Sequence, residues 1–352
     1  MATMRDVANA AGVSTATVSR VINGNGVVAP ALAERVRVAV DALNYRPNLV
    51  ARGLRNQATS VLALVFSDIE NQFFTSVCRG VEDHARKFGY SVMVCNADED
   101  VQKESEYVAV LASQSVAGVI ISPASDHTDV SQLLQRRVPV VALDRALPYA
   151  SDSVHSDSRN GAREGTAHLI AGGARRVGCV TGPAEVSTAH DRLMGYREAL
   201  VAAGMVTEDA LEGYGDFREA GGYLAAKKLL SQPNPPDALF VANNRMMLGV
   251  LRACRETGSR IPDDVSLVGF DDLPWADYVS PPITTVRQPT YDLGTAAARL
   301  LLERIAGTDA PPREIVLRPE LVIRASSIKP KVGPKRAVGK THEAQSAPPA
   351  LT

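Results

Sequence analysis

Cysteine is scarce in this sequence and is not spaced for a disulfide framework or a metal site. The 352 residues contain four cysteines, at positions 78, 95, 179 and 254. A small secreted scaffold needs a higher density of cysteine, and a zinc site needs closely paired ligands. We therefore expect free thiols in a reducing cytoplasm, with no metal and no cofactor.

Long apolar runs are missing as well. Apolar strings such as residues 61–66 fall far short of the about 20 residues that a membrane helix needs. The N-terminus also lacks the apolar segment behind basic residues that is typical of an export signal. We expect a cytoplasmic protein without a membrane partner, and its 45% hydrophobic content is enough to form two or three cores.

Motifs that carry catalysis are also absent. The sequence has no GxSxG elbow, no GxxxxGK[ST] loop and no HExxH pair, and its six histidines are scattered. Gly172 and Gly173 lie between an expected helix and an expected strand, the reverse of the order that a dinucleotide-binding loop requires. They fit the end of a helix and a turn, so we predict that the protein is not an enzyme.

Residues 4–23 predict two short helices joined by a tight turn. Thr3 and Asp6 have the spacing of a capping box, Gly12 can end the first helix, and Ser14 can cap the second. A third helix is expected from Pro30, with an apolar stripe at Leu32, Val36, Val40 and Leu43. Together these elements predict a helix-turn-helix head that reads DNA.

The second helix of this head has one apolar and one polar face. Thr17, Val18, Val21 and Ile22 form the apolar face, which leaves Thr15, Ala16 and Arg20 on the opposite side. An arginine there can pair with guanine, and small side chains leave room for thymine methyl groups. Thr15, Ala16 and Arg20 are therefore the expected base readers.

Positive charge is concentrated at the two ends of the chain. Residues 1–58 carry seven arginines and three acids, a net charge of plus four, and residues 328–352 carry five basic residues and one acid, again plus four. Because the whole chain is minus one, the middle must be minus nine. Such a distribution fits a DNA-binding head on an acidic body.

Short apolar runs alternate with amphipathic stretches beyond residue 60, which predicts parallel sheets covered by helices on both faces. The runs fall into two groups with a break near residues 154–160, so we expect two doubly wound α/β lobes. The expected strands are residues 61–66, 91–97, 118–123, 139–144, 176–182, 238–243 and 265–272, and helices are expected at 74–88, 160–171 and 192–203.

Polar and aromatic residues follow the expected strands, where ligands bind in sheets of this kind. Carboxylates can accept hydrogen bonds from hydroxyls, Arg and Asn can donate them, and aromatic rings can cover a sugar face. We therefore expect a small polyhydroxylated ligand in a cleft between the lobes. The residues that suggest it are Asp68, Asn71, Phe73, Phe74, Asp144, Arg145, Asp157, Arg192, Phe217, Asn243, Asn244, Asp271, Asp272 and Trp275.

Each of these residues also has a structural alternative. Asp271 and Asp272 could end a strand and cap a turn. Phe73 and Phe74 could belong to the core of the following helix. Arg192 could form a surface salt bridge, which would contribute little stability.

The sequence closely resembles the lactose/galactose repressor (LacI/GalR) family. The resemblance rests on DVANAAGVSTATVSRVING and YRPNLVARGL near the N-terminus, and on DIENQFF, DRLMGYREAL, GDFREAGGY, VANNRMMLG, VSLVGFDD and PPITTVRQP in the body. Two positions depart from the family pattern: Gln72 replaces a usual proline, and Asn244 a usual aspartate. The loss of that charge means that the ligand cannot be copied from a relative.

The family resemblance implies site residues in both parts of the chain. In the hinge, Leu54 is the position expected to wedge into the minor groove, although it could instead pack as a linker leucine. The expected DNA contacts are Thr15, Ala16, Thr17, Arg20, Asn23, Arg52 and Leu54. The expected effector contacts are Phe73, Asp157, Arg192, Phe217, Asn244 and Asp271.

The expected organisation is a helix-turn-helix domain at residues 1–46, a hinge at 47–58, a two-lobed domain at 59–327 and a disordered basic tail at 328–352. The first lobe is expected at about 60–157 plus 286–318, and the second at about 158–285 plus 319–327. The resemblance implies a homodimeric repressor on the chromosome that binds a pseudo-palindromic operator under the control of a small molecule. A freestanding solute-binding protein and a ligand-independent architectural DNA-bending protein are the alternatives, but the first would not need the head and the second would not need the lobes.

Overall fold

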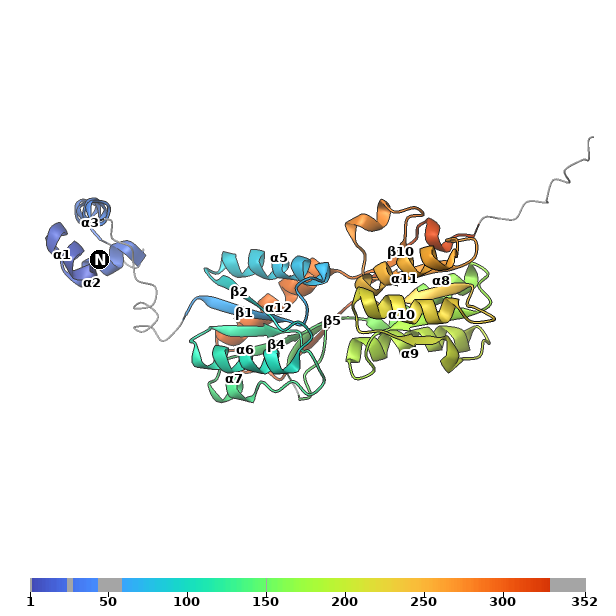
Figure 1. Cartoon of the computed structure of the whole chain (residues 1–352). Coiled ribbons are helices and arrows are strands. Elements are labelled where there is room, and N and C mark those ends of the chain that lie inside the picture. Colours follow the sequence, from blue (N-terminus) through green and yellow to red (C-terminus); the bar gives the residue numbers. More distant parts are fainter. Residues whose placement is uncertain (1, 24–27, 44–58, 150, 330–352) are drawn as a thin grey trace, which may run out of the picture.

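The computed structural model describes residues 2–23, 28–43, 59–149 and 151–329. Three helices form the N-terminal head, and two α/β lobes follow (Figure 1). The head consists of α1 (Met4–Ala11), α2 (Thr15–Asn23) and α3 (Pro30–Ala42). Its small core contains the buried side chains of Val7, Ala11, Val18, Val36 and Ala39.

The capping signals of the head are confirmed. The hydroxyl of Thr3 accepts a hydrogen bond from the main-chain N–H of Asp6, and the Asp6 carboxylate accepts one from the N–H of Thr3 at 2.8 Å. Gly12 has a φ of 62°, a left-handed conformation that glycine adopts without strain. Ser14 accepts a hydrogen bond from the N–H of Thr17 at 3.1 Å. Leu43 departs from the expectation, because it follows the end of α3 and is exposed.

The first lobe contains a six-stranded parallel sheet in the order β11-β5-β4-β3-β1-β2. Helices α5 and α12 pack against each other on one face, and α6 and α7 lie on the other. The central strands β1, β3 and β4 are buried on both faces, which explains why they are continuous apolar runs. The strands are β1 (Val61–Phe66), β2 (Ser91–Asn96), β3 (Gly118–Ile121), β4 (Val140–Leu143), β5 (Asp152–Ser156) and β11 (Glu314–Leu317), and the helices are α5 (Gln72–Lys87), α6 (Val101–Ser113), α7 (Ser131–Gln135) and α12 (Thr290–Ile305).

The second lobe repeats this plan with the order β12-β10-β9-β8-β6-β7, in which β12 alone runs antiparallel to its neighbour. Helix α8 packs against α9, and α10 against α11. The strands are β6 (Val177–Thr181), β7 (Glu212–Tyr214), β8 (Ala238–Val241), β9 (Ser266–Phe270), β10 (Thr284–Arg287) and β12 (Glu320–Val322); the helices are α8 (Ser158–Ala171), α9 (Ser187–Ala202), α10 (Glu219–Leu230) and α11 (Asn244–Thr257), with short 3-10 turns η1 (Asp209–Leu211), η2 (Pro274–Asp277) and η3 (Ala325–Ser327).

The chain crosses between the lobes three times, after β5, after β10 and after β11. Strand β10 belongs to the second sheet as far as Arg287, so the return to the first lobe comes later than the expected residue 286. Several expected strands were also too long at their carboxyl ends. Ser122, Asp144, Gly182 and Asp271 have already left their strands and lie just beyond the carboxyl ends of the sheets.

Candidate effector cleft and DNA-binding head

Helix α2 of the head carries the expected base readers. Thr15, Ala16 and Arg20 on α2 are exposed, as expected for base readers. Thr17 is half-buried, and its hydroxyl lies 2.9 Å from that of Ser14. The Asn23 side chain, Arg52 and Leu54 lie outside the described residues.

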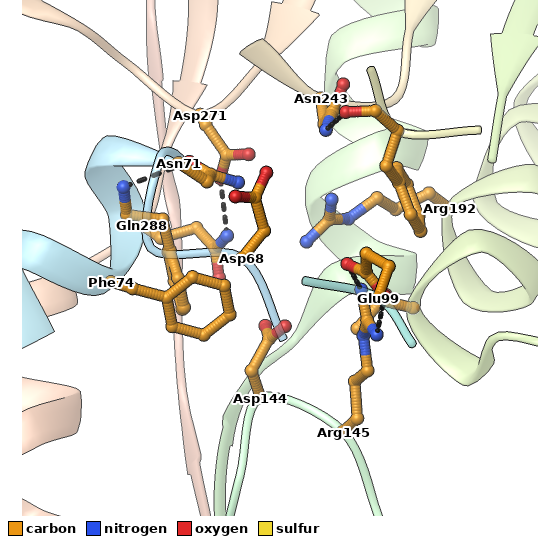
Figure 2. A pocket seen from close by; sticks show the side chains of 13 residues that line it. Asp68, Asn71, Phe74, Glu99, Asp144, Arg145, Arg192, Asn243, Asp271 and Gln288 are labelled. Carbon is orange, nitrogen blue, oxygen red and sulfur yellow. Dashed lines mark hydrogen bonds and ion pairs between the residues drawn. The ribbon is translucent and has the colours of Figure 1, made fainter. Parts of the chain in front are cut away.

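A pocket between the lobes gathers residues that follow strands of both sheets. Figure 2 shows carboxylates and guanidinium groups that point into one space from opposite sides. The carboxyl ends of parallel strands meet there, which explains why the loops that follow them supply the lining. The lining residues are Asp68, Asn71, Phe73, Phe74, Glu99, Asp144, Arg145, Thr188, Arg192, Phe217, Asn243, Asp271 and Gln288.

The N-terminus of α5 supplies the aromatic wall on the first-lobe side. Asn71 caps this helix by accepting a hydrogen bond from the N–H of Phe73 at 3.0 Å. The ring of Phe74 stacks on Phe66 with centroids 4.8 Å apart and contacts Phe73 edge to face at 4.9 Å. Both rings are buried in the lobe core and also line the pocket. The core and ligand interpretations of these phenylalanines are therefore compatible.

Asp144 and Arg145 enter the pocket directly after β4. Asp144 has a φ of 64°, a conformation that costs an ordinary residue free energy and that occurs often at functional sites. Burial raises the pKa of its carboxyl, against the opposing effect of Arg192. The Arg145 guanidinium donates to both carboxylate oxygens of Glu99 at 2.7 Å and to the carbonyl of Pro123 at 3.0 Å.

Arg192 on α9 is not the surface salt bridge that the sequence left open. The residue is 4% exposed. Its guanidinium lies 3.9 Å from the centroid of the Phe270 ring and donates to the carbonyl of Ala242 at 2.7 Å. Among the described residues, no carboxylate lies within ion-pair distance of it. A buried guanidinium that lacks an ion pair is a strong donor available to a ligand.

Asp271 and Phe217 complete the second-lobe side, and both have left-handed backbones, with φ values of 72° and 60°. Gln288 donates a hydrogen bond of 2.5 Å to the Asp271 carboxylate, whose pKa is raised by burial. The Phe217 ring covers Gly182 so closely that a Cβ there would lie 2.4 Å from it. Gly182 is therefore needed for the position of this ring.

Polar contacts join the lobes beside the pocket. Arg218 donates to the carbonyl of Asp98 at 2.8 Å, and the Arg245 guanidinium lies 2.8 Å from the Glu70 carboxylate. The amide of Asn244 donates to Asn71 Oδ1 at 2.8 Å. The structure thus has the lobes in contact on both sides of the lining residues.

The comparisons with known proteins agree with this architecture. Residues 3–48 match the family model "Bacterial regulatory proteins, lacI family", and residues 166–327 match the model "Periplasmic binding protein-like domain". The ribose operon repressor of Escherichia coli (strain K12) is 36% identical over 331 residues, which cover 93% of this chain and all of that protein. The repressor PurR of Photobacterium profundum is 35% identical over 329 residues, or 93% of this chain and 98% of that protein.

The chain belongs to the lacI family of bacterial regulatory proteins.

A solved structure of the lac repressor dimer, bound to operator and to the anti-inducer ONPF, shares the fold with a TM-score of 0.82 and 29% identity. It matches 93% of this chain, which covers 99% of the lac repressor chain. Members of the lacI family are DNA-binding transcriptional repressors with an effector-binding domain, and they are regulators rather than enzymes. The fold class and the function class predicted from the sequence are confirmed. Within the described part of the chain, no helix is both long and apolar enough to span a bilayer.

Four of the six predicted effector residues of this lacI-family chain line the pocket: Phe73, Arg192, Phe217 and Asp271. Asp157 does not, and instead caps α8 by accepting a hydrogen bond from the N–H of Asn160 at 3.1 Å. Asn244 lies in the contact with Asn71, next to a second opening at η2. Its neighbour Asn243 lines the pocket and donates to the carbonyl of Phe217 at 3.0 Å.

Sequence reasoning did not single out Glu99, Thr188 and Gln288. Glu99 follows β2, so the rule that strand ends supply ligands could have found it. Gln288 follows β10, a strand that the sequence analysis did not recognise. Asp272, in contrast, has a structural role as the partner of Arg287 and Arg324, with contacts of 2.7 and 2.8 Å.

Proposed function

We propose that this protein is a dimeric repressor that reads a pseudo-palindromic operator and binds a neutral sugar, ribose foremost, between its lobes. The observation that carries the proposal is the buried Arg192 guanidinium, which lacks an ion pair and faces the carboxylates of Asp68, Asp144 and Asp271. Donors and acceptors of this kind on opposite walls suit a ring of hydroxyl groups.

The charges of the lining favour a ligand without negative charge. Arg145 is already paired with Glu99, which leaves three aspartates and one arginine, a formal charge of minus two. Sugar hydroxyls can donate to the carboxylates and accept from Arg192, while the Phe74 and Phe217 rings cover apolar faces of the sugar. Among the described residues that line the pocket, Arg192 is the one cation without an ion pair, so a phosphate would lie beside three carboxylates with little positive charge to compensate it.

Ribose is the first sugar to test because the E. coli ribose operon repressor is similar over nearly the whole chain. Asn244 departs from the family pattern, so titration and not likeness to that relative decides which sugar binds. The pocket also suits a small ring, since aromatic side chains and cross-lobe contacts bound it closely. Nucleobases are the main alternative, because they would also stack on these rings.

The DNA-binding part of the proposal rests on the exposed face of α2. Thr15, Ala16 and Arg20 would contact bases, with Thr17, Asn23 and the hinge residue Arg52 as further contacts and Leu54 as the minor-groove wedge. Two heads in one dimer would read half-sites about one helical turn apart. The hinge is assigned to residues 47–58 and the basic tail to 328–352, and the protein would work in the cytoplasm on the chromosome.

Calorimetric titration of the full-length protein tests the effector. We expect ribose to bind, and ribose 5-phosphate and adenine to bind at least tenfold more weakly or not at all. Arg192→Ala should abolish ribose binding while it leaves affinity for an operator duplex nearly unchanged. Binding of ribose 5-phosphate in preference to ribose, or unchanged ribose binding by Arg192→Ala, would contradict the proposal.

A further inference from the structure

The turn after β2 holds two consecutive non-glycine residues in left-handed conformations. Asp98 has a φ of 61° and Glu99 a φ of 55°. The N–H of Glu99 donates to the carbonyl of Ser67 at 2.6 Å, and Asn96 Oδ1 accepts from the N–H of Asp98 at 3.3 Å. Two adjacent strained residues persist only where the surroundings fix them, and such strain is frequent at ligand clamps and switches.

The two residues of this turn face different partners. The Glu99 carboxylate points into the pocket and holds both terminal nitrogens of Arg145, which is 6% exposed (Figure 2). Asp98 points to the other lobe, where its carbonyl and its carboxylate accept from Arg218 at 2.8 and 3.2 Å. One turn therefore connects a pocket residue with the opposite lobe.

The opposite lobe also has two consecutive residues of which one lines the pocket and the other contacts the facing lobe. Phe217 lines the pocket, and its ring centroid lies 5.6 Å from the Arg145 guanidinium, while the next residue, Arg218, reaches Asp98 outside the pocket. Phe217 also has a left-handed backbone, and Asp216 fixes the loop by accepting from the N–H of Arg218 at 2.9 Å. The pairs 98–99 and 217–218 thus meet across the lobes with one contact inside the pocket and one at its rim.

We propose that these two pairs form a closure latch, in which Glu99 and Arg218 are positioning residues for the effector. The Arg218–Asp98 contact holds the lobes together. Because Glu99 follows Asp98 in the same turn and pairs with Arg145, this contact also fixes the position of Arg145. Glu99 and Arg218 then increase affinity because they favour the closed arrangement that a ligand requires. The latch rests on the proposed function, since it acts on the same pocket.

Ribose affinity of single and double variants tests the latch. We expect Arg218→Ala to raise the ribose Kd about 5- to 30-fold, mainly through faster release, and Arg218→Lys to restore part of the loss. Asp98→Asn should change the Kd less than about twofold, because asparagine tolerates the left-handed conformation and the main-chain acceptor remains. In the double variant Glu99→Gln/Arg218→Ala, the ribose Kd should rise by less than the product of the two single-variant fold-changes, because both residues act through the same turn.

Arg260→Ala is the matched control, because Arg260 forms an exposed ion pair with Asp264 within the second lobe, at 2.8 Å. A Kd for Arg218→Ala that equals the control's would overturn the latch. The latch would also be wrong if the ribose Kd of the double variant rose by the full product of the two single-variant fold-changes.

Amide hydrogen exchange on the protein without sugar tests the latch separately from the choice of effector. Arg218→Ala should speed exchange at residues 96–100 and at 143–147, a segment that it does not touch, whereas Arg260→Ala should change neither. If the exchange result appears but ribose does not bind to the wild type, the latch stands and ribose is the wrong effector. If Arg218→Ala leaves both segments as protected as the control does, the latch is wrong.

Discussion

At the residue scale, left-handed backbone conformations explain how the residues of the pocket are positioned. Six described non-glycine residues have a positive φ, and five of them lie in the cleft or beside it: Asp98, Glu99, Asp144, Phe217 and Asp271. Such conformations redirect the chain sharply at the strand ends and turn side chains back toward the other lobe. The free energy they cost is offset by the cores that hold the flanking strands.

Gly182→Ala tests whether the Phe217 ring must keep its position. The added Cβ would lie 2.4 Å from the ring and force it to move, so the ribose Kd should rise about tenfold, equivalent to about 1.4 kcal/mol, with the fold retained. Gly213→Ala is the control, since its Cβ would meet Ala225 on α10, away from the pocket, at 3.0 Å. Calorimetry and thermal melts separate the two. Equal affinity losses in both variants would argue against a specific role for Gly182.

The pH dependence of ribose affinity tests the acidic wall. Burial raises the pKa values of Asp144 and Asp271, so these groups take up protons as pH falls before an ordinary aspartate does. Protonation removes the negative charge and turns one carboxylate oxygen into a donor, which weakens the hydrogen bonds that sugar hydroxyls donate to these groups. Affinity should therefore weaken as pH falls from neutral toward the ordinary aspartate range. The same shifts mean that ionisation of these groups at neutral pH disfavours the folded state without ligand. Titrations from pH 5 to 8 should show a slope that Asp144→Asn reduces, and an equal slope in that variant would exclude Asp144.

At the scale of elements, the buried Asp152 links β5 to helix α12 and to the segment that precedes the edge strand β11. Asp152 on β5 accepts from Arg304 of α12 at 2.7 and 3.0 Å and from the N–H of Arg313 at 2.8 Å. Burial alone would raise its pKa, but the hydrogen bonds from Arg304 and Arg313 outweigh burial and lower it. Stability from this group is therefore complete above the ordinary aspartate pKa and is lost as pH falls through the lowered value.

Asp152→Asn should lower the free energy of unfolding by roughly 2–4 kcal/mol at neutral pH, because it removes the charge of a buried carboxylate that pairs with Arg304 and Arg313. The loss should shrink as pH falls through the lowered pKa of Asp152, where the wild-type carboxyl itself becomes protonated. Urea unfolding at several pH values measures both effects. A loss that does not depend on pH would mean that packing, and not charge, accounts for it.

Elements differ in how well the sequence predicts them. Long apolar runs such as β1 and β8 were predicted correctly, because a strand buried on both faces has no polar positions. β7, β11 and β12 were not, since they are short edge strands with polar or exposed positions. For the site, Arg192 and Asp271 follow strand ends in the sequence. The Arg145–Glu99 pair could not be predicted in this way, because it forms only when folding brings the ends of β4 and β2 to the same cleft. Asp157 was predicted as an effector contact; in the structure it caps α8 and is not among the residues that line the pocket.

At the scale of the whole molecule, the protein joins a DNA-binding head to a two-lobed body that has a polar pocket between its lobes. An effector can change operator affinity only as far as it binds the two lobe arrangements differently. Arg218, Asn244 and Arg245 make contacts across the lobes in the arrangement that the structure shows. Whether the effector weakens or strengthens operator binding depends on which lobe arrangement brings the hinges of the two subunits together.

Leu54→Ala tests the separation of the two functions. We expect operator affinity to fall about tenfold or more, because the wedge at the hinge is shortened, while the ribose Kd stays within about twofold. Anisotropy of a labelled duplex and calorimetry measure the two affinities. Unchanged operator affinity would remove the wedge assignment.

The most direct measurement of the central claim is operator binding with and without ribose. A pseudo-palindromic duplex from upstream of the protein's own gene would be titrated by fluorescence anisotropy with wild type and with Arg192→Ala. We predict that ribose changes the wild-type operator Kd at least fivefold, and that Arg192→Ala binds the duplex equally well but does not respond to ribose. No response in the wild type, or the same response in Arg192→Ala, would contradict a ribose-gated switch acting through this cleft.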